Sequence, residues 1–457
     1  MYKIKNTTLA CSTLILFLFG TACKRFIEVD PPRTRLTKVT VFENDETAKS
    51  AVADVYNKVN NLNRPGISWY ASLSADEIMT SNFIEYEQFN QNAISPLNRQ
   101  ILEEWNGAYN AIYAANALIE GLKSSVGISS SNKSQLIAEA KFLRAFVHYN
   151  LAALFGDIPY ITTTDYHENG LVVKKEIREV LELIVKDLTE AQPALPIDFN
   201  NFGKERIRAT SWAVAAMLAR VYLYQKNFGM SEAEADKVIG NTNFRLESDL
   251  NEVFLRNSSE AIWQLMPPNG TNFPNEAYSF NTPVSNTPGV ARLHTSLINT
   301  FESNDQRRMK WLAFDAGSSG YYPFKYKSSQ VNTVVTEYSI VFRLAELYLI
   351  RAEARIRQGK LMGLNSGQSD INIIRERAGL LPLSISTDKG LLTAVEQERR
   401  VELFTEWGDR WTYLKHLGKI DAVLGAVKPN WKPAAALYPL PNSELLLNPN
   451  LIQNPGY

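Results

Sequence analysis

The carboxylates best placed for acid–base chemistry are concentrated near residue 400. Four glutamates follow one another along a single predicted helix: Glu396, Glu398, Glu402 and Glu406. Two carboxylates can hydrolyse a glycosidic bond, one as acid and one as base or nucleophile. However, Arg399 and Arg400 stand among these glutamates, and helical neighbours three or four positions apart can neutralise one another. We therefore interpret the row as structural ion pairs, and we extend this to four charges set among apolar residues, Arg343, Glu346, Arg351 and Glu353.

Other catalytic or metal-binding patterns are missing from the sequence. The four histidines are scattered and show no H-E-x-x-H or similar metal-ligand spacing: His148, His167, His294 and His416. The chain also has no G-x-S-x-G nucleophile elbow, no phosphate-binding P-loop and no G-x-G-x-x-G dinucleotide motif. We predict no catalytic residue, no metal site and no cofactor.

Aromatic residues in loops are the stronger indication of function. Phe, Trp and Tyr make up 11% of the chain, and many lie beside amides and carboxylates in two irregular segments. Flat rings stack on the C–H faces of sugars while nearby polar groups bind the hydroxyls, and the same surface suits a peptide. Any single ring could instead pin its loop to the scaffold. The candidate ligand-binding residues are Trp69, Tyr70, Asp76, Tyr86, Phe89, Asn90, Tyr278, Trp311, Tyr321 and Tyr322, with Phe83, Phe273 and Phe280 nearby.

Helices must position these loops, because apolar residues recur at steps of three and four through most of the chain. The predicted helices are 46–60, 105–122, 134–154, 176–192, 210–225, 231–239, 340–358, 366–378 and 389–407. Proline and glycine interrupt the pattern between about 240 and 338, where we expect few helices, and residues 433–457 should form an extended tail.

The predicted fold is therefore all-α. Alanine-rich helices such as 210–225 permit close approach of helix axes, as in tetratricopeptide-type hairpins, although no strict 34-residue repeat is visible. We divide the chain into a leader (1–22), an N-terminal region (23–240) and a C-terminal region (241–457) whose first hundred residues form a loop-rich lobe. The whole is expected to contain about four helix pairs.

The first 22 residues have the pattern of a secretory leader that ends at a lipidation site. Lys3 and Lys5 precede an apolar run over 9–19, and the small residues 20–22 precede Cys23. A mature chain that begins with a lipid-modified cysteine would be anchored to a membrane without spanning it. The alternative is an ordinary secretory signal that ends beside a cysteine, since the usual lipobox leucine is replaced here by glycine at position 20.

Charge and cysteine content narrow the class of protein further. The chain has 48 basic and 48 acidic residues, and loss of the leader would leave a net charge of −2. This balance gives no reason to expect nucleic acid as a partner. Cys11 would leave with the leader, so the mature chain could form no internal disulfide and must rely on packing.

Several blocks in sequence order resemble the RagB/SusD family of outer-membrane nutrient-uptake lipoproteins. Trp105, Tyr109, Ile112 and Asn116 resemble its W-x3-Y-x2-I-x3-N signature. The other matching blocks are 23–32, 41–42, 47–56, 138–145 with 155–159, 338–354, 374–379, 398–403, 408–411 and 448–457.

The resemblance implies a non-catalytic binding protein with four tetratricopeptide-like helix pairs and a ligand lobe. Such proteins are anchored on the outside of the outer membrane of Bacteroidota. They act as the lid of a SusC-like TonB-dependent transporter and capture glycans or peptides for it. No binding residue is carried over by a motif, so the candidate residues above rest on composition. A surface glycan hydrolase that uses a carboxylate pair and an assembly scaffold without its own ligand remain the alternatives.

Overall fold

A computed structural model describes residues 41–80, 83–268, 271–281, 291–317, 319–328 and 334–457. Cys23, the predicted lipidation site, and the leader lie outside the described residues. Within the described ranges, no helix combines the length and the apolar character that crossing a bilayer requires.

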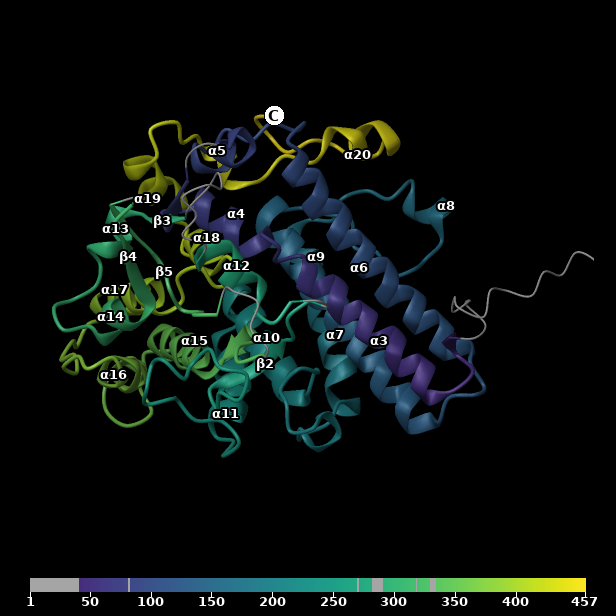
Figure 1. Ribbon diagram of the computed structural model, residues 1–457, viewed down its shortest axis with the longest axis horizontal. Helices are drawn as coiled ribbons and strands as arrows, with labels where there is room; N and C mark the ends of the chain where they lie inside the picture. Colours follow the sequence, from purple (N-terminus) through teal and green to yellow (C-terminus); the bar gives the residue numbers. More distant parts are fainter. Residues whose placement is uncertain (1–40, 81–82, 269–270, 282–290, 318, 329–333) are drawn as a thin grey trace, which may run out of the picture.

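The fold is predominantly helical, as predicted, with three small two-stranded sheets (Figure 1). The first part of the chain contains α3 (Asp45–Asn61), α4 (Gly66–Ser74), α5 (Ile84–Asn90), α6 (Arg99–Ser124), α7 (Ser130–Phe155), α8 (Tyr166–Asn169), α9 (Ile177–Ala191), α10 (Ser211–Tyr224) and α11 (Phe228–Ile239). The middle contains α12 (Asn275–Asn281), α13 (Thr295–Ile298) and α14 (Gln306–Trp311). The last part contains α15 (Leu344–Arg357), α16 (Gly367–Arg377), α17 (Asp388–Glu402), α18 (Asp409–His416), α19 (Ile420–Val427) and α20 (Asn442–Leu447).

All three sheets are antiparallel pairs. One joins two segments of the middle region, and the other two join the middle region to the first part and to the last part of the chain. β1 (Ile78–Met79) pairs with β3 (Arg292–Leu293), β2 (Ala261–Leu265) with β6 (Ser339–Arg343), and β4 (Leu312–Asp315) with β5 (Gly320–Pro323). Short 3₁₀ turns occupy Gln192–Ala194, Asn200–Phe202 and Pro433–Ala436.

Eight long helices pack in chain order, so the predicted scaffold of helix pairs is confirmed. α3 packs on α6, α7 on α9, α10 on α11, and α15 on α16, and each pair also contacts the next. Sequence explains the ends of these helices: the Asn44 side chain accepts from the Glu46 and Thr47 amides at the start of α3, and Gly156 (φ 77°) ends α7. In Figure 1 the first two pairs occupy the right of the molecule, while α4, α5, β3, β4 and β5 lie in its upper left part.

Trp263 of β2 attaches the middle region to this scaffold. Its indole is buried between Phe142 and Phe146 of α7, at ring-centroid distances of 4.8 and 5.2 Å, and Phe342 of β6 on the neighbouring strand. Edge-to-face aromatic pairs of this kind add to the area that they bury. The two-stranded sheet of β2 and β6 is therefore part of the main core.

Two helix boundaries predicted from the sequence were wrong. Residues 339–343 form strand β6, because a short buried run rich in Ile, Val and Phe suits a strand as well as a helix. α17 ends at Glu402 and does not reach residue 407. Lys325 Nζ donates to the main-chain oxygens of Glu402 (2.7 Å) and Phe404 (2.8 Å), so a buried cation holds the carbonyls that a longer helix would use. The tail is also less extended than predicted, since it contains α20.

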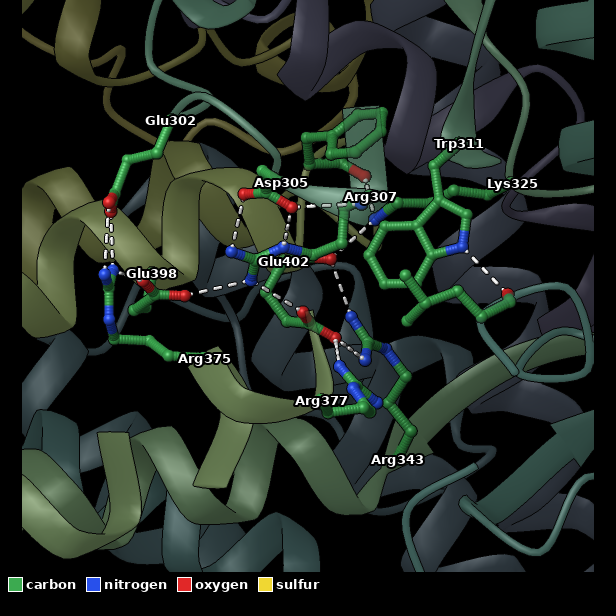
Figure 2. A network of polar contacts seen from close by, with 12 residues as sticks. Glu302, Asp305, Arg307, Trp311, Lys325, Arg343, Arg375, Arg377, Glu398 and Glu402 are labelled. Atoms are coloured by element: carbon green, nitrogen blue, oxygen red, sulfur yellow. Dashed lines mark hydrogen bonds and ion pairs between the residues drawn. The ribbon is translucent and has the colours of Figure 1, made fainter. Parts of the chain in front are cut away.

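The carboxylate row of α17 is paired, as predicted, but its partners come from other elements and not from the same helix. Arg307 Nη1 of α14 donates to Glu398 (2.9 Å) and to Glu402 (3.0 Å), and Arg343 Nη1 of β6 donates to Glu402 (2.5 Å). Arg377 of α16 also binds Glu402. Figure 2 shows this arrangement, with Glu402 between three guanidinium groups.

The electrostatics of Glu402 follow from this enclosure. Burial opposes its ionisation, but the guanidinium groups of Arg377, Arg343 and Arg307 outweigh burial and hold the pKa of Glu402 well below its ordinary value. The carboxylate is therefore a permanent anion that joins α14, α16, α17 and β6. It is fully buried and is no candidate for acid–base catalysis.

Removing this charge should destabilise the fold strongly. We expect Glu402→Gln to lower the free energy of unfolding by about 3–5 kcal/mol, because three buried guanidinium groups lose their shared anion. Chemical denaturation monitored by circular dichroism measures the change. The matched control is Glu103→Gln, whose surface partner Arg99 lies 2.6 Å away, and which should change stability by only about 0.5 kcal/mol. Equal effects of the two substitutions would contradict this account.

Candidate ligand-binding surface

The two segments singled out in the sequence meet through aromatic contacts. Trp69 of α4 lies edge-to-face against Tyr86 of α5, with ring centroids 5.8 Å apart. Phe280 of α12, some two hundred residues later in the chain, lies 5.6 Å from the same indole. The segment before α6 and the middle region therefore share one aromatic cluster.

Helix α4 forms the floor of this cluster. All nine of its residues are buried, and Trp69 and Tyr70 are each only 2% exposed. Tyr70 stacks on Phe89 at 4.6 Å, and its hydroxyl donates to Gln100 of α6. These three predicted residues support the surface from beneath and present almost no area to a ligand.

The outer part of the cluster, which we call the aromatic face, consists of the exposed Phe83 and Tyr278 and the partly buried Tyr86. Phe83 and Tyr86 lie 4.8 Å apart, and Tyr278 is 52% exposed with its ring parallel to Phe273. Burial raises the pKa of Tyr86, and the nearby groups Glu103, Glu85 and Tyr278 raise it further. Two predicted residues, Tyr86 and Tyr278, thus lie on α5 and α12, the two helices that meet at Trp69.

The β4–β5 hairpin extends the region, because β5 packs against α12. Tyr321 lies directly opposite Phe314, with ring centroids 5.2 Å apart, whereas Tyr322 pairs with Ala313. Successive side chains of a strand point to opposite faces, so Tyr321 and Tyr322 cannot line the same side of the hairpin.

Phe314 is an exposed ring that sequence reasoning missed. It is 58% exposed on the same side of the hairpin as Tyr321. The sequence does contain a hairpin pattern here, because two short runs with aromatic residues flank the glycine-containing stretch 316–320. Recognising this pattern would have included Phe314 among the candidates.

Asp76 and Asn90 form hydrogen bonds and ion pairs within the protein. Asp76 is buried and accepts from Arg410 Nε at 2.8 Å and from Arg400. Burial would raise the pKa of Asp76, but the charges of Arg410 and Arg400 outweigh it and lower the pKa. The main-chain oxygen of Asn90 accepts from Lys428 Nζ at 3.0 Å. These contacts hold the loop around α5 against the C-terminal helices.

Trp311 is fully buried, within the polar network of Figure 2. Its indole N–H donates to the Leu250 main-chain oxygen at 3.0 Å, and Lys325 Nζ lies 5.0 Å from the ring centroid. The ring has no exposed area for a ligand in this conformation. Burial depends on contacts between distant segments, which is why the sequence alone could not separate Trp311 from Tyr278.

Glu276 is a buried residue of α12, two residues before Tyr278. One carboxylate oxygen accepts from Asn63 Nδ2 (2.7 Å) and from the Ser339 hydroxyl, while the other is buried with no hydrogen-bond partner. Burial raises the pKa of Glu276 to about 7, and the hydrogen bonds from Ser339 and Asn63 reduce this rise only in part. The carboxyl group is thus close to half-protonated at neutral pH.

Metal binding has no basis in the part of the chain that the structure describes. No group of three or more His, Cys, Asp or Glu side chains there is arranged to hold a metal ion. The described residues of this region form a surface of aromatic rings on a buried aromatic floor.

Comparison with known proteins links this geometry to one family. Residues 25–223 match a family model described as "Starch-binding associating with outer membrane", and residues 313–457 match the model of the SusD family. The chain is 30% identical to SusD-like protein P2 of Formosa agariphila, over 79% of this chain and 81% of that protein. It is 24% identical to the starch-binding protein SusD of Bacteroides thetaiotaomicron, over 72% of this chain and 74% of that protein. The solved structure of a laminarin-binding SusD-like protein superposes with a TM-score of 0.76 at 24% identity, covering 91% of this chain and all of that chain.

Trp311 should affect stability far more than an exposed ring does. We expect Trp311→Ala to lower the free energy of unfolding by about 3–5 kcal/mol through loss of buried area and the cavity left behind. Tyr278→Ala, at a half-exposed position, should change it by no more than about 0.5 kcal/mol. Denaturant titration of both variants checks this, and a mild effect of Trp311→Ala would show that its surroundings can rearrange.

Glu276 should make stability depend on pH. Its pKa is higher in the folded state than in the unfolded chain, so its contribution is fully present below about pH 4.5 and is lost as pH rises through about 7. Between these limits the contribution of Glu276 to the free energy of unfolding should fall by about 3 kcal/mol. Unfolding measured from pH 4.5 to 8 for wild type and Glu276→Gln should show the variant gaining relative stability as pH rises. A difference that is constant with pH would mean that Glu276 does not titrate in this range.

Proposed function

This chain belongs to the SusD family, and from that membership we propose that it is a non-catalytic protein that binds an oligosaccharide through its aromatic face and delivers it to an outer-membrane transporter. The observation that carries the proposal is the exposure of Phe83 and Tyr278, with the partly buried Tyr86 beside Phe83, above a buried floor. Rings held in this way can stack on sugar faces without being ordered first, so little affinity is lost to conformational entropy.

Carbohydrate is favoured as the ligand class by two independent lines. Related proteins are described as binding starch or laminarin, and one matching family model is itself described as starch-binding. Asp76 is the one charged residue among the predicted ligand-binding residues, and it is already paired with Arg400 and Arg410, so it is not free to bind a peptide terminus. A peptide remains the alternative ligand, and titration can distinguish the two.

A hydrolytic role has little support. The carboxylates of this row are engaged in ion pairs. Glu398 and Glu402 bind arginines and are buried, and Glu396 binds Lys419 at 2.5 Å. The names of the relatives describe binding proteins. We therefore propose that the protein binds its ligand without hydrolysing it.

Family membership supports a proposal for the location and the partner of the protein. A matching model is described as associating with the outer membrane. We propose that Cys23 carries the lipid that anchors the protein on the outer face, and that the helical scaffold docks on a SusC-like TonB-dependent transporter as its lid. Labelling with a palmitate analogue tests the anchor, with Cys23→Ser as the variant that should lose the label. Co-purification from native membranes tests the partnership, and recovery of the protein without any barrel protein would count against it.

Ligand binding should depend on Tyr278. Isothermal titration against soluble starch, laminarin and other glycan oligomers, with peptides as a second panel, identifies the ligand class. For the best ligand we expect Tyr278→Ala to weaken binding by about 1–3 kcal/mol, the cost of losing one stacked ring. The matched control is Tyr113→Ala, because Tyr113 is 54% exposed on α6, outside the aromatic face. Equal affinities of wild type and Tyr278→Ala, or binding of peptides alone, would contradict the proposal.

A further inference from the structure

A second candidate site lies inside the helical scaffold, apart from the aromatic face. A cavity of about 760 Å³ opens between α7, α9, α10 and α18. None of its lining residues belongs to the aromatic face or to its floor. Its volume is in the range of sites for small organic molecules.

The walls of this cavity are largely apolar. Ala152 and Ala153 of α7 line one side, and Ile177 and Leu181 of α9 line another. Ile177 is 40% exposed and so presents apolar surface to the cavity. The cavity therefore offers contact area to the hydrocarbon part of a ligand.

Lys415 of α18 supplies a positive charge in these apolar surroundings. Its Nζ donates to the Ala153 main-chain oxygen at 2.8 Å, and no described residue places a carboxylate within 4.0 Å of it. Lys419, four residues further on, has such a partner in Glu396 at 2.5 Å. An ammonium group has three donors, so Lys415 retains hydrogen-bonding capacity that its described neighbours do not use.

The charge around the cavity is also predominantly positive. Arg178 and Lys226 line it and are exposed, and the described residues give neither of them an ion pair. Glu182 is the one carboxylate among the lining residues. His416 lines the cavity too, but its Nε2 is 3.1 Å from Glu353. A negatively charged ligand would therefore gain from at least two cations besides Lys415.

We propose that this cavity binds a small organic carboxylate, with its charged group on Lys415 Nζ and its apolar part against Ala152 and Leu181. Arg178 and Lys226 at the rim would attract the anion without enclosing it. A neutral ligand of the same shape would leave the Lys415 ammonium without an anion in an apolar setting, which costs free energy. Neither the family models nor the relatives' names describe such a ligand.

The protonation of Lys415 should control this site. Burial lowers the pKa of Lys415 to about 7, with no carboxylate near enough to raise it again. A carboxylate ligand binds the protonated amine, so affinity should be highest below pH 7 and fall above it. The other titratable or charged groups that face the cavity are Tyr149 of α7, Arg178 and Glu182 of α9, Tyr224 and Lys226 at the end of α10, and His416 of α18 with Glu353 behind it.

Titration of the purified protein with benzoate tests the proposal. We expect benzoate to bind and neutral benzamide not to, and the affinity for benzoate should fall about tenfold between pH 6 and pH 8 as Lys415 loses its proton. Lys415→Met, which keeps the length and the apolar stem of the side chain, should weaken binding at pH 6 at least about tenfold. Lys419→Met is the matched control and should leave the affinity unchanged.

A second measurement does not depend on any variant folding. In protein labelled with ¹³C-lysine, the Lys415 Cε signal should shift on addition of benzoate. The midpoint of the pH titration of this signal should move to higher pH when benzoate is present. Unchanged Lys415 signals at millimolar benzoate, or equal affinity of wild type and Lys415→Met, would overturn the proposal. Tighter binding of galacturonate than of benzoate would overturn the assignment of an apolar ligand body.

Discussion

The buried carboxylate of Glu402 is the constraint on which the rest of the structure depends. It lies between Arg307, Arg343 and Arg377, which come from α14, β6 and α16 (Figure 2). An anion in the interior is tolerable only when cations and hydrogen bonds surround it. Because each cation lies on a different element, α14, β6 and α16 must take positions that bring all three guanidinium groups to one carboxylate.

The same helix also binds the segment after α4 through a second charge cluster. Arg400 of α17 reaches Asp76, which Arg410 of α18 also binds, and Asp76 follows directly after the buried helix α4. Glu402 and Arg400 thus point to different partners from one helix. The floor of the aromatic face is therefore fixed relative to the middle region without a disulfide, in a chain with only two cysteines.

Much of the fold could be predicted from the sequence because it depends on local periodicity. Helices such as α7 and α10 repeat apolar residues at helical spacing and begin or end at recognisable capping residues. The strand at Ile340 was missed because a short buried apolar run has no decisive period. The paired state of Glu402 was predicted correctly, but its partners were not, since they lie 25 to 95 residues away. Long-range pairing leaves no local trace in a single sequence.

The same limit applies to the candidate surface, and it explains how the surface is built. Composition selected Trp69, Trp311 and Tyr278 alike, yet two of these rings are buried and one is half exposed. Phe83 packs on Tyr86, and Tyr86 in turn packs on the buried rings of Trp69 and Tyr70. This cluster therefore contains more aromatic residues than it exposes. An aromatic-rich loop therefore predicts where an aromatic surface lies. Which of its rings are buried and which are exposed depends on packing between segments as distant as α4 and α12.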